Sequence, residues 1–217
     1  MQLRVLSVNV SRPKVIAVVN GDSVLSGIAK KPLGLANVSV SALNIEGDQQ
    51  ADLTVHGGPD KAVYAYAASH WPWWEREHHL PCAPGTFGEN LTLDTGDETE
   101  VSIGDRFLWG DVEMEVAQPR APCFKFGLHT GRSDAAQLMA VSGRCGFYLR
   151  VTRAGRAQVE NAVLERSYAS GAATVREAFH AVLGKPSVAS LETVIDAEAL
   201  AENWASAVEK RLRALKP

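Results

Sequence analysis

Residues 118–125, with the sequence QPRAPCFK, include the side chain best suited to chemistry, Cys123. Two prolines stiffen this segment and fix the direction of the thiol. Arg120 and Lys125 lie on either side of Cys123, and nearby cations favour the thiolate, which attacks electrophiles and binds metals. Arginine also suits bidentate binding of phosphate. The alternative is a buried cysteine that behaves as a small apolar side chain.

Residues 55–61, with the sequence VHGGPDK, form a second candidate for ligand binding. The paired glycines Gly57 and Gly58 let the backbone turn tightly and approach a ligand closely. Successive backbone N–H groups in such a turn can bind an anion. His56 and Lys61 are placed to donate further hydrogen bonds. The alternative is a plain Gly-Gly-Pro turn.

Two more segments could supply polar groups to the same ligand. Asn90, in the sequence TFGENL, has an amide that matches the donor–acceptor edge of a pterin-type heterocycle. A bulged strand would also explain this segment. Arg144 and Arg150, in the sequence GRCGFYLRV, could contact phosphate. We expect the other two cysteines, Cys82 and Cys145, to be structural.

The distribution of charge also suggests an anion site. The formal net charge of −3 gives no indication of a nucleic-acid partner, and we expect none. Residues 86–117 contain nine acidic side chains and one basic side chain, whereas residues 118–157 contain seven basic and one acidic. A basic segment in an acidic protein is typical of an anion-binding region. A solvated surface is the alternative.

Composition excludes several classes of protein. Three cysteines without close spacing argue against a disulfide framework and against a structural zinc site. No stretch of about eighteen apolar residues is present, so no membrane span is expected. The N-terminus, MQLRVLSVNVSRPK, lacks the long apolar region of a signal peptide. We therefore expect a cytoplasmic protein.

Residues 1–167 predict a domain of many short strands, because runs rich in β-branched and aromatic residues alternate with Gly, Asp and Pro. This pattern is typical of a barrel or sandwich. Gly21 and Asp22 supply one turn. Two helices interrupt the strands, near residues 67–78 with Pro72 in the first turn and near residues 133–143. The second helix has Ser133 as its predicted N-cap and Gly143 as its predicted C-cap.

Residues 168–217 have a different character and predict a small helical extension. Apolar residues recur at spacings of three and four in TVREAFHAVLG and in AENWASAVEKRLRALKP. SVASLETVID predicts a short helix between them. Three short amphipathic helices bury little alone, so they should pack on one another or on the strands. The fold class is therefore mainly β with α, divided near residue 167.

Taken in order, VHGGPDKAVYAY, GTFGENL, GDRFLWG, QPRAPCFK and GRCGFYLRV resemble the MOSC family, named after the C-terminal domain of molybdenum-cofactor sulfurase. The terminal helices are similar to the three-helix extension of the YiiM-like branch of that family. The resemblance covers essentially the whole chain. It implies a β-barrel-like domain, residues 1–167, followed by a helical extension, residues 168–217.

The resemblance also implies a function. Cys123 matches the site cysteine of the family, which would coordinate molybdenum or carry sulfur. The surrounding residues would hold molybdenum cofactor, and we do not expect pyridoxal phosphate to bind. These residues are His56, Gly57, Gly58, Lys61, Asn90, Arg120, Lys125, Arg144 and Arg150. The YiiM-like branch implies a molybdenum-dependent oxidoreductase that reduces N-hydroxylated compounds, including 6-hydroxylaminopurine, with electrons from a partner protein.

Two other functions remain open on sequence grounds. The same residues would serve a non-catalytic carrier of molybdenum cofactor or sulfur, with Cys123 holding a persulfide or the metal in transit. A third possibility is a protein-interaction module that uses the tryptophan-rich helix and the C-terminal helices.

Overall fold

A closed β-barrel forms the main part of the fold, seen in the computed structural model, which describes residues 1–52 and 57–216. Seven strands follow one another in the order β12-β8-β9-β10-β6-β7-β1, and pairing of β1 with β12 closes the ring. These strands are β1 (Gln2–Val10), β6 (Val63–Ala67), β7 (Leu91–Leu93), β8 (Arg106–Trp109), β9 (Val112–Pro119), β10 (Phe147–Arg153) and β12 (Val163–Tyr168). The predicted mainly β fold with α-helices is confirmed.

Most neighbouring strands of the barrel are antiparallel, but β6 and β7 run parallel. Both strands are buried along their whole length, as their apolar sequences VYAYA and LTL require. By contrast, buried and exposed residues alternate at the start of β1, which has one face toward the core and one toward solvent. Sequence reasoning read residues 63–67 as part of a motif and missed strand β6.

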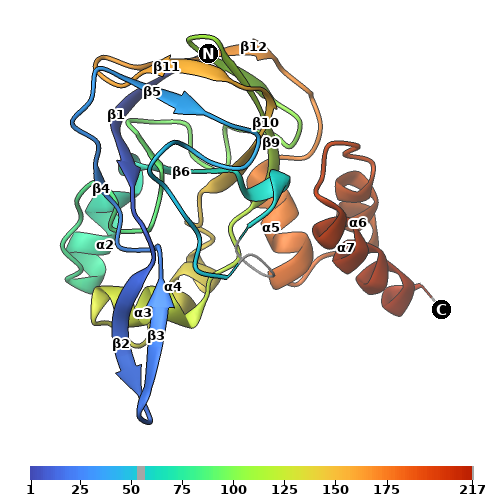
Figure 1. The fold of residues 1–217 in the computed structure, drawn as a ribbon. Helices are drawn as coiled ribbons and strands as arrows, with labels where there is room; N and C mark the ends of the chain where they lie inside the picture. Colours follow the sequence, from blue (N-terminus) through green and yellow to red (C-terminus); the bar gives the residue numbers. More distant parts are fainter. Residues whose placement is uncertain (53–56, 217) are drawn as a thin grey trace.

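Five further strands complete the β-structure of the described residues. β4 (Lys31–Pro32) extends the barrel sheet beside β1. β5 (Asn37–Val40) pairs with β11 (Gly155–Gln158). β2 (Lys14–Val19) and β3 (Asp22–Ser26) form a hairpin that projects away from the barrel (Figure 1). Its turn is Asn20–Gly21, both at positive φ (51° and 90°), one residue earlier than predicted.

Three helices lie between barrel strands: α2 (Trp71–His78), α3 (Phe124–Thr130) and α4 (Ala135–Ser142). Pro72 lies in the first turn of α2, as predicted. Gly143 ends α4 in the left-handed conformation, also as predicted. The prediction of Ser133 as the N-cap of α4 was wrong, because the N-cap is Asp134, without a capping side-chain hydrogen bond. Helix α3 was not predicted at all. Two 3₁₀ turns, Pro59–Lys61 and Ala68–His70, complete this part of the chain.

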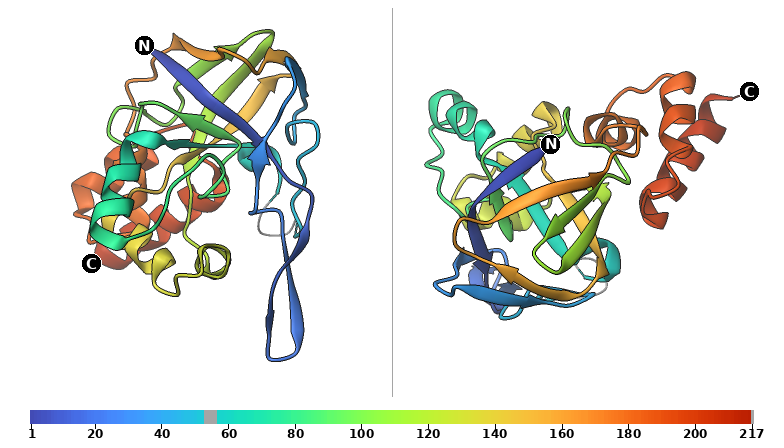
Figure 2. Two further views of the ribbon diagram at one scale, coloured as in Figure 1. Left: turned by 90° about the vertical axis from the view of Figure 1, so that its left-hand side faces the viewer. Right: turned by 90° about the horizontal axis from the view of Figure 1, so that it is seen from above.

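The C-terminal region contains the three predicted helices, α5 (Val175–Leu183), α6 (Val188–Ile195) and α7 (Glu202–Leu215). Thr174 and Glu177 form a capping box at the start of α5. The helices lie at one side of the barrel in both further views (Figure 2), and their apolar residues belong to the same hydrophobic core as the barrel. The boundary near residue 167 between two domains stays a prediction.

A buried carboxylate joins α5 to the barrel. Glu98 is fully buried and accepts hydrogen bonds from the Nε2 atom of His70 at 2.8 Å and from the backbone N–H of Gly146 at 2.5 Å. Arg176, on α5, approaches the same carboxylate at 3.4 Å. This network fixes the position of α5 relative to strand β10. Within the described residues, no helix is both long and apolar enough to cross a membrane.

Candidate functional site

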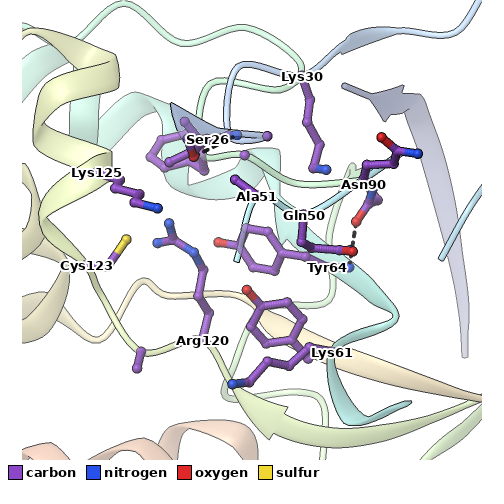
Figure 3. A pocket seen from close by; sticks show the side chains of 17 residues that line it. Ser26, Lys30, Gln50, Ala51, Lys61, Tyr64, Asn90, Arg120, Cys123 and Lys125 are labelled. Atoms are coloured by element: carbon purple, nitrogen blue, oxygen red, sulfur yellow. Dashed lines mark hydrogen bonds between the residues drawn. The ribbon is translucent and has the colours of Figure 1, made fainter. Parts of the chain in front are cut away.

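A pocket lies where the base of the β2–β3 hairpin meets one end of the barrel. It encloses about 670 Å³ of empty space, counting the solvent at its mouth. Figure 3 shows side chains from distant parts of the sequence converging on it. The lining residues are Ser26, Gly27, Ile28, Lys30, Gln49, Gln50, Ala51, Lys61, Tyr64, Phe87, Gly88, Asn90, Arg120, Ala121, Cys123, Lys125 and Tyr148.

Cys123 lines this pocket with a free, half-buried thiol. It follows the end of β9 at Pro119 and directly precedes α3, with an extended backbone (φ −133°, ψ 158°). The two other thiols lie outside the pocket-lining set. Burial, together with Glu75 and Glu89, raises the pKa of Cys82 to about 12, and burial raises the pKa of Cys145. Cys123 is therefore the thiol that a ligand in the pocket can reach.

Arg120 brings a buried positive charge to the same pocket. Its residue is only 5% exposed. Its guanidinium carbon lies 5.1 Å from the ring centre of Tyr64 and 5.5 Å from that of Phe126, and its Nη1 atom lies 3.0 Å from the sulfur of Met139. Across the described part of the chain, no carboxylate forms an ion pair with Arg120. A buried cation without a carboxylate suits an anionic ligand.

Two tyrosines form one wall of the pocket. Tyr64 on β6 and Tyr148 on β10 are paired across the sheet, with ring centres 5.1 Å apart. The Tyr64 hydroxyl donates a hydrogen bond to the carbonyl of Cys145 at 2.7 Å. Burial raises the pKa of both phenols, against the opposing effect of Arg120. Both therefore keep their protons at neutral pH.

Lys30 enters the pocket region from the segment after the hairpin. Its ammonium group forms a buried ion pair with Asp48. Burial lowers the pKa of Lys30, while Asp48 acts in the opposite direction. Because Asp48 also accepts a hydrogen bond from Asn90 at 3.0 Å, the pair ties three segments of the pocket wall together.

Asn90 lines the pocket, but its amide is used within the protein. The Nδ2 atom donates to Asp48 and, at 3.2 Å, to the carbonyl of Asn9. The Oδ1 atom accepts from the backbone N–H of Tyr64 at 3.1 Å. Both donors and the acceptor therefore already have partners. In the structure this side chain joins β1, β6 and β7, and the role of Asn90 in binding a heterocycle edge stays a prediction.

Two further lysines, Lys61 and Lys125, line the pocket. Lys125 donates a hydrogen bond from Nζ to the carbonyl of Leu25 at 3.1 Å, so its charge is held at the base of the hairpin. Lys61 is the last residue of the 3₁₀ turn Pro59–Lys61, and burial lowers its pKa against the opposing effect of Asp60. The pocket thus brings together five of the predicted site residues: Cys123, Arg120, Lys125, Lys61 and Asn90.

The other predicted site residues lie elsewhere. Gly57 and Gly58 precede the 3₁₀ turn and are not among the lining residues, while His56 falls outside the described residues. The guanidinium of Arg144 stacks on the ring of Trp73, 4.7 Å from its centre. Arg150 pairs with Asp60 at 2.8 Å and with Glu115 at 3.0 Å. Each guanidinium thus has another partner, and neither residue lines the pocket. Their phosphate contacts stay predictions.

Sequence reasoning missed much of the pocket wall. Residues 26–30 and 49–51 carry no motif, and the fold brings them together where the chain returns from the hairpin to the barrel. One signal was available at Gly27, which stands in the sequence SGIAK. A β-carbon there would lie 2.3 Å from the carbonyl oxygen of Gln49, so only glycine permits this close approach.

Comparison with known proteins shows which family the chain resembles. The family model of the MOSC domain matches residues 52–164. The chain is 36% identical over 192 residues to protein YiiM of Escherichia coli, covering 83% of this chain and 85% of that protein. It is 35% identical over 139 residues to a protein of Gibberella moniliformis named as a reductase, covering 60% of this chain and 24% of that protein.

Solved structures show the same fold. The crystal structure of YiiM from Geobacillus stearothermophilus superimposes with a TM-score of 0.78 at 29% identity and covers 97% of this chain and 99% of that one. The similarity therefore extends through the helices α5 to α7 as well as the barrel. On the family match and on the relatives that span most of its length, the chain belongs to the MOSC family.

Proposed function

We propose that this protein binds molybdenum cofactor in the pocket around Cys123 and reduces N-hydroxylated compounds to amines. MOSC domains are associated with binding of this cofactor in general. The reductase name of one relative and the similarity to YiiM support redox chemistry. The substrate class, of which 6-hydroxylaminopurine is the member we would test, is part of the proposal.

One observation carries the proposal. The pocket combines a reachable thiol with the cationic side chains of Arg120, Lys61 and Lys125, and none of the described residues that line it has a carboxylate. Such a lining favours an anionic ligand that also accepts a sulfur donor. Molybdenum cofactor has both properties, because it carries a phosphate and a metal that accepts a soft thiolate ligand. The residues present therefore fit this group.

The side chains divide into three roles. Cys123 would hold the metal through its thiolate. Arg120, which is buried and has no carboxylate partner in the described chain, would bind the phosphate together with Lys61 or Lys125. Tyr148 would donate a hydrogen bond, because its raised pKa keeps the phenol protonated.

The overall reaction balances without any oxidant. Reduction of R–NH–OH to R–NH₂ breaks the N–O bond, consumes two electrons and two protons, and releases one water. When bound, the cofactor supplies the two-electron redox chemistry, and the protein supplies orientation and electrostatics. The electrons would come from a separate redox protein. We propose a cytoplasmic location, since all three cysteines are free thiols.

The test is expression in a host that makes molybdenum cofactor, followed by metal analysis and assay. The wild type should contain molybdenum and should reduce 6-hydroxylaminopurine with reduced methyl viologen as donor. Cys123→Ser should lose both properties. Cys82→Ser is the matched control, because Cys82 is also half-buried but does not line the pocket. A wild type that is loaded with molybdenum but gives no turnover would favour a carrier of the cofactor. Full molybdenum loading of Cys123→Ser would refute the site itself.

A further inference from the structure

Lys30 is a buried lysine in the wall of the pocket. Only 7% of its side chain is exposed, and its ammonium group pairs with Asp48, whose side chain is fully buried. An ammonium group has three N–H donors. Among the described residues, Asp48 accepts the one hydrogen bond that the side chain of Lys30 makes. Because buried donors need acceptors, the other two N–H groups are available to a molecule in the pocket.

The position of this ammonium group is fixed from two sides. Asp48 also accepts hydrogen bonds from the backbone N–H of Ser11 at 2.9 Å and from Nδ2 of Asn90 at 3.0 Å, so the carboxylate is itself held in place. The backbone of Lys30 packs against Gly85, where a β-carbon would lie 2.6 Å from the Lys30 carbonyl oxygen. Lys30 thus reaches into the pocket of Cys123 from a different segment of its wall (Figure 3).

The pair of Lys30 and Asp48 has no net charge. It adds little to the positive potential of Arg120, Lys61 and Lys125, and it is therefore less suited than they are to hold a phosphate. The N–OH group of an N-hydroxylated substrate is neutral. Two unused N–H donors on a neutral ion pair suit contact with such a group.

Reduction of an N–OH group needs a proton donor. Hydroxide is a poor leaving group, so a proton delivered to the oxygen as it leaves lowers the barrier. The tyrosines of the pocket are poor donors, because Tyr64 already donates to a backbone carbonyl and burial raises the pKa of Tyr148. Arg120 does not release its protons, and Lys125 donates to a backbone carbonyl.

Resting on the proposed function, which sets the substrate, we propose that Lys30 is the proton donor to the leaving oxygen of the N–OH group. As the N–O bond breaks, R–NH–OH takes two electrons from the external reductant, one proton from Lys30 at the oxygen and one from solvent at the nitrogen. The products are R–NH₂ and water, and solvent then returns a proton to Lys30. Burial makes the ammonium a stronger acid, since it lowers the pKa of Lys30 against the opposing effects of Asp48 and Glu89.

Lys30→Arg tests the proton transfer, because a guanidinium keeps the charge beside Asp48 but does not release its proton. In a cofactor-producing host, Lys30→Arg should keep the molybdenum content of the wild type. Its kcat for 6-hydroxylaminopurine with reduced methyl viologen should fall about 100-fold. Lys31→Arg is the matched control, because Lys31 is exposed on β4, and should turn over as the wild type does. Wild-type kcat in Lys30→Arg, or loss of molybdenum from the folded variant, would overturn the proposal.

A measurement on the wild type covers the case in which Lys30→Arg does not fold. The ¹³Cε signal of Lys30 is followed by NMR across the alkaline range, in molybdenum-loaded protein. Its pKa should lie below the ordinary 10.5, and added adenine, the amine product of 6-hydroxylaminopurine, should shift the signal. A pKa at or above 10.5, or no response to adenine, would overturn the proposal.

The pH dependence of turnover separates Lys30 from its titratable neighbours. Asp48 and Glu89 act on its ammonium group, and the pocket is also lined by Lys61, Tyr64, Arg120, Cys123, Lys125 and Tyr148. Since only the protonated lysine donates, the wild-type kcat should fall as pH rises through the pKa of Lys30. Lys30→Arg should lack this fall, and persistence of the same fall in Lys30→Arg would assign it to another group and overturn the proposal.

The two proposals fail in distinguishable ways. No turnover by the molybdenum-loaded wild type would refute the proposed reaction, and the role of Lys30 with it. Turnover by the wild type with an equal kcat in Lys30→Arg would refute the role of Lys30 alone.

Discussion

The guanidinium carbon of Arg120 lies 5.1 Å from the ring centre of Tyr64, inside a wall that also includes Phe126. Cation–π contacts of this kind hold a buried arginine without neutralising its charge. The charge therefore remains available to a ligand in the pocket. Because no carboxylate of the described chain pairs with Arg120, the side chain contributes to binding more than to stability.

Arg120→Met tests whether Arg120 contributes to ligand binding more than to stability. Methionine fills much of the same apolar space and leaves no carboxylate without a partner, so the free energy of unfolding should fall by at most about 1 kcal/mol. Molybdenum content after expression in a cofactor-producing host should fall at least about tenfold. Arg144→Met, which removes a guanidinium outside the pocket, should retain the metal. Loss of metal in both variants would mean that Arg120 has no special role.

His129 should make the protein less stable in acid. Its pKa in the folded protein lies below the ordinary value of 6.5, mainly because of burial, with added effects of Lys14 and Arg120. Between the folded and unfolded pKa values the unfolded chain binds more protons, so the free energy of unfolding rises with pH and falls as pH drops below 6.5. Urea unfolding should show that the free energy of unfolding falls less between pH 7 and pH 5 in His129→Gln than in the wild type.

The same group offers a direct check by NMR. Lys14→Glu replaces a repelling cation with an anion, so the pKa of His129 should rise in that variant. An unchanged His129 titration in Lys14→Glu would show that the hairpin base does not act on α3.

Gly27→Ala should disturb the pocket through the backbone. The added β-carbon would lie 2.3 Å from the carbonyl oxygen of Gln49, which must move together with residues 49–51 of the pocket wall. We expect a loss of about 2 kcal/mol in the free energy of unfolding and lower molybdenum content. Gly34→Ala is the matched control, with no atom within 4 Å of its β-carbon, and should change stability by less than about 1 kcal/mol. If Gly27→Ala kept the stability of the wild type, residues 49–51 could move aside without a cost in free energy, and the prediction would be wrong.

Glu98→Gln should loosen the attachment of α5. Glu98 is fully buried beside His70 and Arg176, and loss of its charge leaves a partly buried arginine without its counterion. We expect the free energy of unfolding to fall by about 3 kcal/mol. Glu113→Gln, 3.9 Å from an exposed Arg153, should cost less than about 1 kcal/mol. Denaturant unfolding compares the two variants. Equal losses in the free energy of unfolding would show that Glu98 does not hold α5 on the barrel.

Much of the fold could be predicted from local sequence. The sequences of β1 and β9 are rich in apolar residues in a pattern typical of strands. Helix α5 begins with a capping box at Thr174, which marks its first turn in the sequence. Helix α3 was missed because its sequence, FKFGLHT, includes a glycine and is only seven residues long. Strand β6 was missed because a fully buried strand has no alternation to reveal it.

The site was predictable only in part. Cys123, Arg120 and Lys125 are close in sequence, so one loop carries them to the same place. Arg144 and Arg150 looked equivalent in sequence, yet their carboxylate and aromatic partners come from distant segments that no local pattern reveals. Asn90 shows the same limit, because its backbone partners lie on β1 and β6.

The pairing of β1 with β12 also has a consequence for how the molecule forms. Gln2 and Glu165 are register partners separated by 163 residues. Contacts of such long sequence separation slow folding, because the chain must lose much entropy before they form. During synthesis the ring cannot close until β12 has left the ribosome, by which time every residue of the pocket has already emerged. Maturation of the protein should therefore be limited by ring closure, and insertion of any cofactor should follow it.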